Sequence, residues 1–113
     1  MTSDRLYVVH IAECIERIEQ FTATGHDHFF DDVMTQDAIL RNLHILSESS
    51  TRVSTEFMSR FPDVPWREMR AFRNVVVHDY LGLDLKQVWD IVVNDLPQLK
   101  AAIMRMLQSF EGT

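Results

Sequence analysis

Apolar residues recur at intervals of three and four along most of the chain, which is the spacing of one face of an α-helix. The first segment with this pattern runs from about Ser3 to Phe21, and Gly25 follows it as a helix stop signal. The second runs from about Thr35 to Arg60 and holds no glycine or proline, so the pattern predicts one unbroken helix. The polar and aromatic residues 26–32, HDHFFDD, predict a short connection with room for a single helical turn.

Proline and glycine mark the ends of a third helix. Pro62 stops the second segment, and Pro65 suits the first turn of the next helix, where a missing N–H removes no intrahelical hydrogen bond. The third helix is therefore expected from Trp66 to about Leu81, and Gly82 ends it.

The last part of the chain contains two further helical segments. Asp84 is a candidate N-cap for a segment from Leu85 to Val93. Pro97 interrupts the periodicity, because proline removes a helical hydrogen bond, and Asp95 can cap a final segment that ends at Phe110. We therefore predict a kink or a split near Pro97.

Together these elements predict an all-α fold, an up-and-down bundle of four long helices of which the last is kinked or split. The chain has 113 residues, no internal repeat and no long linker, so residues 1–113 are expected to form a single domain. Apolar residues make up 46% of the sequence and charged residues 25%, which is typical of a soluble globular protein.

The compartment can be inferred from the apolar runs and the cysteine content. No apolar run is long enough to span a membrane, and the N-terminal residues do not have the layout of a signal peptide. The single cysteine, Cys14, cannot support a disulfide framework, which favours a reducing compartment. We expect a cytoplasmic protein without membrane contact.

The formal net charge of −6, from 11 basic and 17 acidic residues, argues against a protein that coats nucleic acid non-specifically. The basic residues are nevertheless mostly arginine, and Arg67, Arg70 and Arg73 recur at every third position. Arginine binds phosphate in a fixed bidentate geometry. The pattern therefore predicts one local anion-binding edge, with Arg67 and Arg70 as candidate phosphate or RNA contacts.

The stretch RNVVVHDY, residues 73–80, places three polar side chains around a run of valines. On a helix, Asn74 and His78 share a face, and Arg73 and Tyr80 are almost two turns apart. Arg73 and His78 are separated by about 140° around the axis and about 7.5 Å along it, so they would meet only across a bound group such as phosphate.

These side chains fit RNA cleavage, because RNA carries its own nucleophile, the ribose 2′-hydroxyl. The His78 imidazole could transfer protons near neutral pH, and the Arg73 guanidinium could hold the phosphate and stabilise charge in the transition state. Asn74 could orient either group, and no metal or other cofactor is required. One arginine and one histidine are few for a full acid–base cycle, which suggests that two copies meet in a dimer cleft.

Spacing alone leaves a structural alternative open. The C-terminus of a helix favours a histidine such as His78, and Arg73 could simply pair with Glu68 or Asp79. An arginine and a histidine separated by four residues will also recur by chance.

Other polar groups are better explained by solvation or packing. His26 and His28, with the nearby aspartates, lack the spacing of a metal site, and we expect a solvated loop there. His10 and His44 are expected at the surface or at a pocket edge rather than as ligands. Cys14 lies on an amphipathic helix without an activating histidine nearby, so a packed thiol is expected.

Two stretches, QDAILRNLHILSESSTRVS and FPDVPWREMRAFRNVVVHDYLGLDLKQVWDIVVNDLPQLK, resemble the HepT-like branch of the HEPN family. The resemblance covers about Gln36 to Lys100, and residues 3–21 fit the first helix of that family. Its elements are the Pro-Trp-Arg-Glu helix entry, RNxxVHDY, the glycine that follows, Val-Trp and Asp-Leu-Pro-x-Leu-Lys.

This resemblance implies a metal-independent ribonuclease toxin of a type VII toxin–antitoxin pair, with RNA rather than DNA as its substrate. It implies that Arg73 and His78 form the catalytic pair in the cleft of a homodimer and that Asn74 assists them. The implied partner is an MntA-like minimal nucleotidyltransferase, the antitoxin, which adenylylates Tyr80 and silences the nuclease.

The sequence departs from the family at Ser47 and Ser49, where relatives often carry glycine and alanine on either side of the glutamate that is Glu48 here. We expect a change in helix packing and none in the chemistry. Two other functions stay open: a non-catalytic nucleotide- or substrate-binding subunit of a nucleotidyltransferase, and a bare dimeric scaffold. A neighbouring gene for a short nucleotidyltransferase would exclude the scaffold, and an activity assay would separate the nuclease from the binding subunit.

Overall fold

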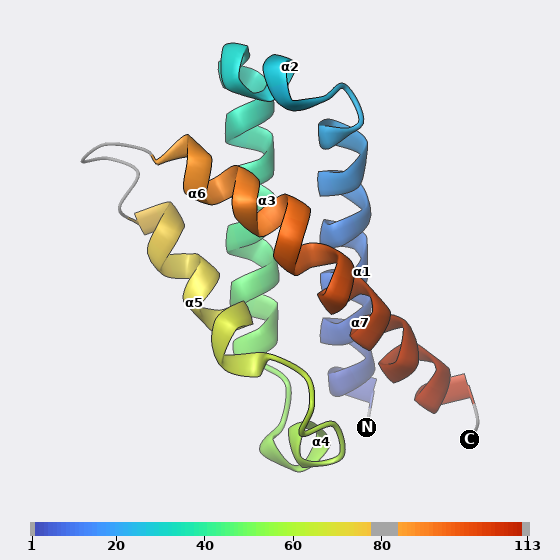
Figure 1. The fold of residues 1–113 in the computed structure, drawn as a ribbon. Helices are drawn as coiled ribbons and strands as arrows, with labels where there is room; N and C mark the ends of the chain where they lie inside the picture. Colours follow the sequence, from blue (N-terminus) through green and yellow to red (C-terminus); the bar gives the residue numbers. More distant parts are fainter. Residues whose placement is uncertain (1, 78–83, 112–113) are drawn as a thin grey trace.

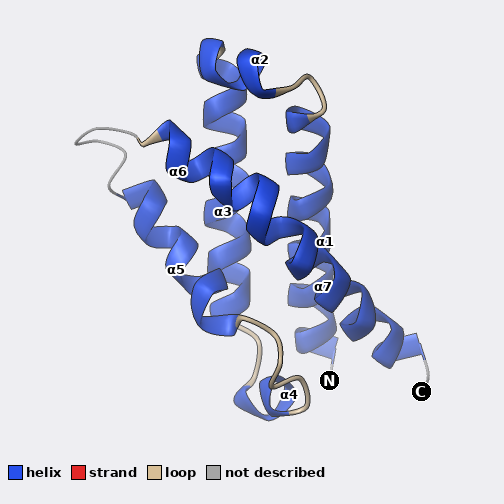
Figure 2. Cartoon of the chain, in the orientation of Figure 1, coloured by secondary structure: helices blue, strands red, loops and turns tan. Residues whose placement is uncertain are grey.

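The computed structural model describes residues 2–77 and 84–111, and every regular element within these ranges is helical (Figures 1 and 2). The elements are α1 (Thr2–Thr22), α2 (His26–Asp31), α3 (Val33–Thr51), α4 (Thr55–Ser59), α5 (Trp66–Val77), α6 (Leu85–Asp90), the π-helical turn η2 (Ile91–Asp95) and α7 (Leu96–Glu111). The prediction of an all-α fold is therefore confirmed. The predicted count of four helices is not confirmed. The described residues form seven α-helices, α1–α7, and their lengths differ widely.

Helix α3 lies at the centre of the arrangement. It runs antiparallel to α1 on one side and to α5 on the other, and the α6–η2–α7 rod crosses in front of α1 and α3 (Figure 1). The core between these helices is mainly aliphatic, with a few aromatic side chains such as Phe29. Its most completely buried side chains include Ile11, Ile15, Ile18, Ile39, Leu43, Leu46, Leu99, Ile103 and Met106.

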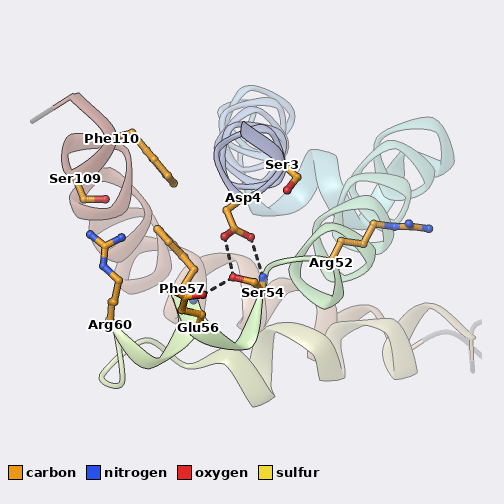
Figure 3. Close-up of a pocket in the computed structure, with 9 residues that line it drawn as sticks. All are labelled: Ser3, Asp4, Arg52, Ser54, Glu56, Phe57, Arg60, Ser109 and Phe110. Carbon is orange, nitrogen blue, oxygen red and sulfur yellow. Dashed lines mark hydrogen bonds between the residues drawn. The ribbon is translucent and has the colours of Figure 1, made fainter. Parts of the chain in front are cut away.

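The predicted helix from Thr35 to Arg60 is wrong in one respect, because the chain leaves the helix after Thr51 and begins α4 at Thr55. Asp4 of α1 is 6% exposed, and its carboxylate accepts hydrogen bonds from the Ser54 backbone N–H and hydroxyl, both at 2.8 Å (Figure 3). Ser54 in turn accepts a hydrogen bond from the backbone N–H of Phe57 and so caps α4. A buried carboxylate needs such donors, and a continuous helix would not supply the Ser54 N–H.

Two predicted local features are confirmed. Residues 26–31 form the short helix α2, and Asp84 caps α6 by accepting a hydrogen bond from the backbone N–H of Gln87 at 3.1 Å. The third helix begins at Trp66 as predicted and is described as far as Val77; its predicted end at Leu81 and Gly82 lies outside the described residues.

The predicted new helix start at Asp95 is wrong. Helical residues follow one another without a loop from Leu85 to Glu111, and Asp95 lies within η2 rather than at a cap. The wider turn is visible in the hydrogen bonding, because the N–H of Leu96 donates to the carbonyl of Ile91, five residues earlier. Pro97 has no N–H to donate, and the π-helical turn just before it absorbs this irregularity without ending the rod.

Among the helices described, none is both long and apolar enough to cross a membrane.

Candidate functional site

Arg73 lies on α5, one turn before Val77, at the junction between α5 and α3. Its guanidinium Nη1 lies 3.4 Å from Oε1 of Glu48 on α3, and the two side chains are 58% and 36% exposed. An ion pair this exposed adds little stability, of the order of 0–1 kcal/mol. Its consequence is orientation, since Glu48 holds the charged end of Arg73 against α3 while leaving it open to solvent. Of the pairings considered from the sequence, Glu68 is not the partner of Arg73, and Asp79 lies outside the described residues.

The three arginines of α5 do not form a straight line. Among residues 66–74 of α5, for which burial is described, the buried positions are Trp66, Met69 and Phe72, and Arg67, Arg70 and Arg73 are exposed beside them. Each step of three residues turns about 60° around the axis, so the cations spiral from the outer face at Arg67 to the α3 junction at Arg73. Within the described residues, Arg73 forms an ion pair, whereas Arg67 and Arg70 form none.

Asn74 follows Arg73 and is exposed on the outer face of α5. The valine run begins beside it, and α5 includes its three residues, up to Val77. His78 and Tyr80 lie outside the described residues, so their predicted positions relative to Arg73 remain predictions.

Ser47 and Ser49, which flank Glu48, are both buried. The Ser47 hydroxyl donates to the carbonyl of His44 at 2.9 Å, and the Ser50 hydroxyl donates to the carbonyl of Ser47 at 2.6 Å. These side chains satisfy their polar groups within their own helix, a common use of serine in helices. Ser47 is thus buried and hydrogen-bonded within α3, Ser49 is buried there as well, and Glu48 between them pairs with Arg73.

His44 lies one turn before Glu48 on α3 and is half-buried. Its ring nitrogen Nδ1 is fully covered and has no hydrogen-bond partner within residues 2–77 and 84–111. The sequence placed His44 at a surface or pocket edge and gave it no role. In the sequence, His44 and Glu48 are four residues apart, which places them on one helix face. This spacing indicates a site only once α5 is known to lie beside that face of α3.

The residues considered for metal binding or nucleophilic chemistry have structural roles. His28 and Asp32 interact with Thr35, and the Thr35 hydroxyl is the main cause that holds the pKa of the Asp32 carboxyl below its usual range. No cluster of three or more metal-binding side chains is found in the part of the chain that is described. Cys14 is 1% exposed, which confirms the predicted packed thiol, and burial raises the pKa of its thiol to about 11.

A cavity of about 350 Å³ opens beside α4 and the first turn of α1 (Figure 3), and α4 lies at the opposite end of the bundle from the end of α5 (Figure 1). It is walled by stacked rings of Phe57 and Phe110, whose centroids are 5.1 Å apart, and the Arg60 guanidinium lies 5.4 Å from the Phe57 ring centroid. The carboxylate of Asp4 at its base is already bonded to Ser54. The lining residues come from α1, α4, α7, the segment after α3 and Arg60 just after α4, and none comes from α5.

Comparison with known families gives one match that covers most of the chain. Residues 11–106 match the family described as "HepT-like: Ribonuclease HepT-like". This range contains both partners of the Glu48–Arg73 ion pair.

Individual relatives agree with this family. The chain is 37% identical over 105 residues to "Probable ribonuclease HepT" of Thermococcus cleftensis, an alignment that covers 92% of this chain and 96% of the relative. It is 32% identical over 100 residues to "Putative RNase MJ1380" of Methanocaldococcus jannaschii, covering 88% and 92%.

A third relative is larger. The chain is 32% identical over 108 residues to "Gamma-glutamylcyclotransferase and putative RNase MJ0434" of M. jannaschii, covering 95% of this chain and 49% of that protein, so it spans about half of the relative's length. No solved structure matches the chain.

Proposed function

Because the chain belongs to the HepT-like ribonuclease family, we propose that it is an RNA endonuclease whose phosphate-binding residue is Arg73. The observation that carries the proposal is the position of Arg73. It is an exposed guanidinium at a helix junction, oriented by a carboxylate from a second helix and accompanied by Arg70 and Asn74 on the open face of α5.

The chemistry follows from the substrate. The ribose 2′-oxygen attacks the neighbouring phosphorus, the bond to the 5′-oxygen breaks, and the products are a 2′,3′-cyclic phosphate and a 5′-hydroxyl. Arg73 binds the non-bridging oxygens and stabilises the charge that develops on them. His78 transfers the proton at the 2′- or 5′-oxygen, and Asn74 helps to orient the phosphate. No step in this scheme uses a metal ion.

The proposal includes a homodimer. A single Arg73–His78 pair offers one group for two proton transfers, and a twofold cleft would bring two imidazoles to one substrate. We also propose, from the family resemblance, that the protein is the toxin of a pair whose antitoxin is an MntA-like nucleotidyltransferase and that the antitoxin attaches AMP to Tyr80.

Growth of a bacterial host tests the proposal. Expression of the chain alone should slow growth, and Arg73→Ala or His78→Ala should relieve the effect. Truncation of the exposed Arg73 removes little packing, so circular dichroism should be unchanged. If the parent is harmless and leaves purified tRNA and mRNA intact, the chain is better described as a binding subunit of a nucleotidyltransferase.

A further inference from the structure

Two buried side-chain polar atoms have no hydrogen-bond partner among the residues described, Asn42 Oδ1 and His44 Nδ1. The two side chains differ in whether their other polar atoms form hydrogen bonds. The Asn42 amide donates to the carbonyl of Ala38 at 2.8 Å, so it is partly satisfied. No side-chain hydrogen bond is described for His44. The covered Nδ1 has no acceptor beside it, so the ring proton is better placed on Nε2, and the imidazole then has an N–H donor that no described residue accepts.

The location of His44 relates it to the proposed RNA site. His44 and Glu48 are four residues apart and so lie on the same face of α3, about 6 Å from each other along the axis. Glu48 contacts Arg73, and α5 runs in the opposite direction to α3 (Figure 1). One turn back along α3 from Glu48 therefore corresponds to one turn forward along α5 from Arg73. His44 lies at the level of the last described turn of α5.

The charges around this edge favour an anion. Arg41, three residues before His44 on α3, is exposed, as are Arg70 and Arg73 on α5. Two carboxylates oppose these cations: Glu48, which pairs with Arg73, and the exposed Asp37, one turn before Arg41 on α3. Arg41 on α3 and Arg73 on α5 thus lie about one helical turn from the level of the imidazole, and arginine is the side chain best suited to phosphate oxygens.

We propose that His44 is a further RNA-binding residue at this edge, whose imidazole donates a hydrogen bond to an oxygen of the phosphate that Arg73 holds. The inference rests on the proposed function for the identity of the ligand. Of the two ring nitrogens, only Nδ1 is buried without a partner. A neutral imidazole carries one N–H, and placing it on Nε2 avoids a buried donor without an acceptor and directs the proton to the ligand.

Binding of an RNA that cannot be cleaved tests the contact. The probe is a single-stranded oligonucleotide with 2′-O-methyl groups throughout, which lacks the nucleophile, and its affinity is measured by fluorescence anisotropy. His44→Ala should weaken binding about tenfold, and His44→Gln should recover most of the loss because its amide can donate a hydrogen bond. The matched control is His10→Ala, a half-buried histidine on α1, which should stay within twofold of the parent.

Several results would overturn the inference: a parent that does not bind the probe, His44→Ala binding as tightly as the parent, or His44→Ala and His10→Ala weakening binding equally. AMP serves as a second probe, because a free nucleotide carries the same phosphate chemistry. If His44→Ala weakens the binding of AMP but not that of the RNA probe, His44 does not contact RNA. Thermal melts by circular dichroism show whether each variant folds, and His44→Gln retains the test if His44→Ala does not.

Cleavage of unmodified RNA, measured in parallel, separates this inference from the proposed function. If the parent does not cleave RNA and His44→Ala still weakens probe binding, the nuclease assignment is wrong and the RNA contact of His44 stands. If His44→Ala cleaves RNA and binds the probe as the parent does, the His44 contact is wrong and the nuclease assignment stands.

Discussion

The carboxylate of Glu48 and the guanidinium of Arg73 meet across the junction of α3 and α5, with 3.4 Å between Oε1 and Nη1. The same carboxylate that orients the arginine also places a negative charge next to it. Glu48 therefore has two opposite effects on a bound anion, since it directs the cation and repels the ligand.

Replacing Glu48 with glutamine should separate these effects. In Glu48→Gln the repulsion disappears, so KM for RNA should fall about two- to fivefold. The guanidinium loses its fixed direction, so kcat should fall about tenfold. Steady-state cleavage of a fluorogenic RNA measures both constants. A raised KM with an unchanged kcat would mean that Glu48 does not act on Arg73 in this way.

The Asp4–Ser54 contact should be among the more valuable polar interactions for stability. Asp4→Ala removes the acceptor of two hydrogen bonds and leaves the Ser54 N–H unsatisfied, so the free energy of unfolding should drop by about 2–4 kcal/mol. Ser54→Ala should cost about 1–2 kcal/mol through loss of the cap. Urea denaturation measures both values. The control is Ser59→Ala, an exposed serine bonded only to its own helix, and a drop as large as that of Asp4→Ala would contradict this explanation.

The same contact shows where prediction from sequence stops. The Ser54 cap of α4 is local, because its donor, the Phe57 N–H, lies three residues away, but the Asp4 carboxylate that binds the Ser54 N–H lies 50 residues away, and no local pattern indicates it. Locally encoded features, such as the Asp84 cap and the start of α5 at Trp66, were predictable because their partners lie within one turn. Pro97 marks the irregularity in the sequence, but the periodicity does not say whether the chain ends a helix there or widens one turn, as it does at η2.

The candidate site follows the same division. The exposure of Arg67, Arg70 and Arg73 beside the buried positions of α5 follows from helical periodicity. The Glu48 partner and the neighbouring His44 required knowledge of which helix lies beside α5 and in which direction it runs.

Cys14 should make stability depend on alkaline pH. Burial raises the pKa of its thiol from 9.0 to about 11 in the folded protein, so the unfolded chain loses the proton first. The contribution is fully present below pH 9 and is lost as the pH rises through 11. Two pKa units correspond to roughly 3 kcal/mol. Urea unfolding of the parent and Cys14→Ala between pH 8 and 11 measures this term, and a constant difference between them across that range would contradict it.

Tyr80 carries the regulatory part of the proposal. Co-expression with the cognate nucleotidyltransferase should add one or more AMP groups to the parent and none to Tyr80→Phe, because the phenol oxygen is the attachment point. The added phosphate would place negative charge near the cations of α5 and oppose RNA binding. Intact-mass measurement and peptide mapping detect the modification. A neutralised complex with unmodified Tyr80 would leave steric blocking by the partner as the mechanism.

The central claim is that this chain cuts RNA through Arg73, and cleavage by the purified protein in the presence of EDTA tests it most directly. The parent should convert single-stranded RNA to fragments with 2′,3′-cyclic phosphate and 5′-hydroxyl ends. Arg73→Ala should reduce the rate by at least about 100-fold. The matched control, Arg17→Ala on the exposed side of α1, should stay within twofold. Intact RNA with the parent, or equal rates for the parent and Arg73→Ala, would contradict the account.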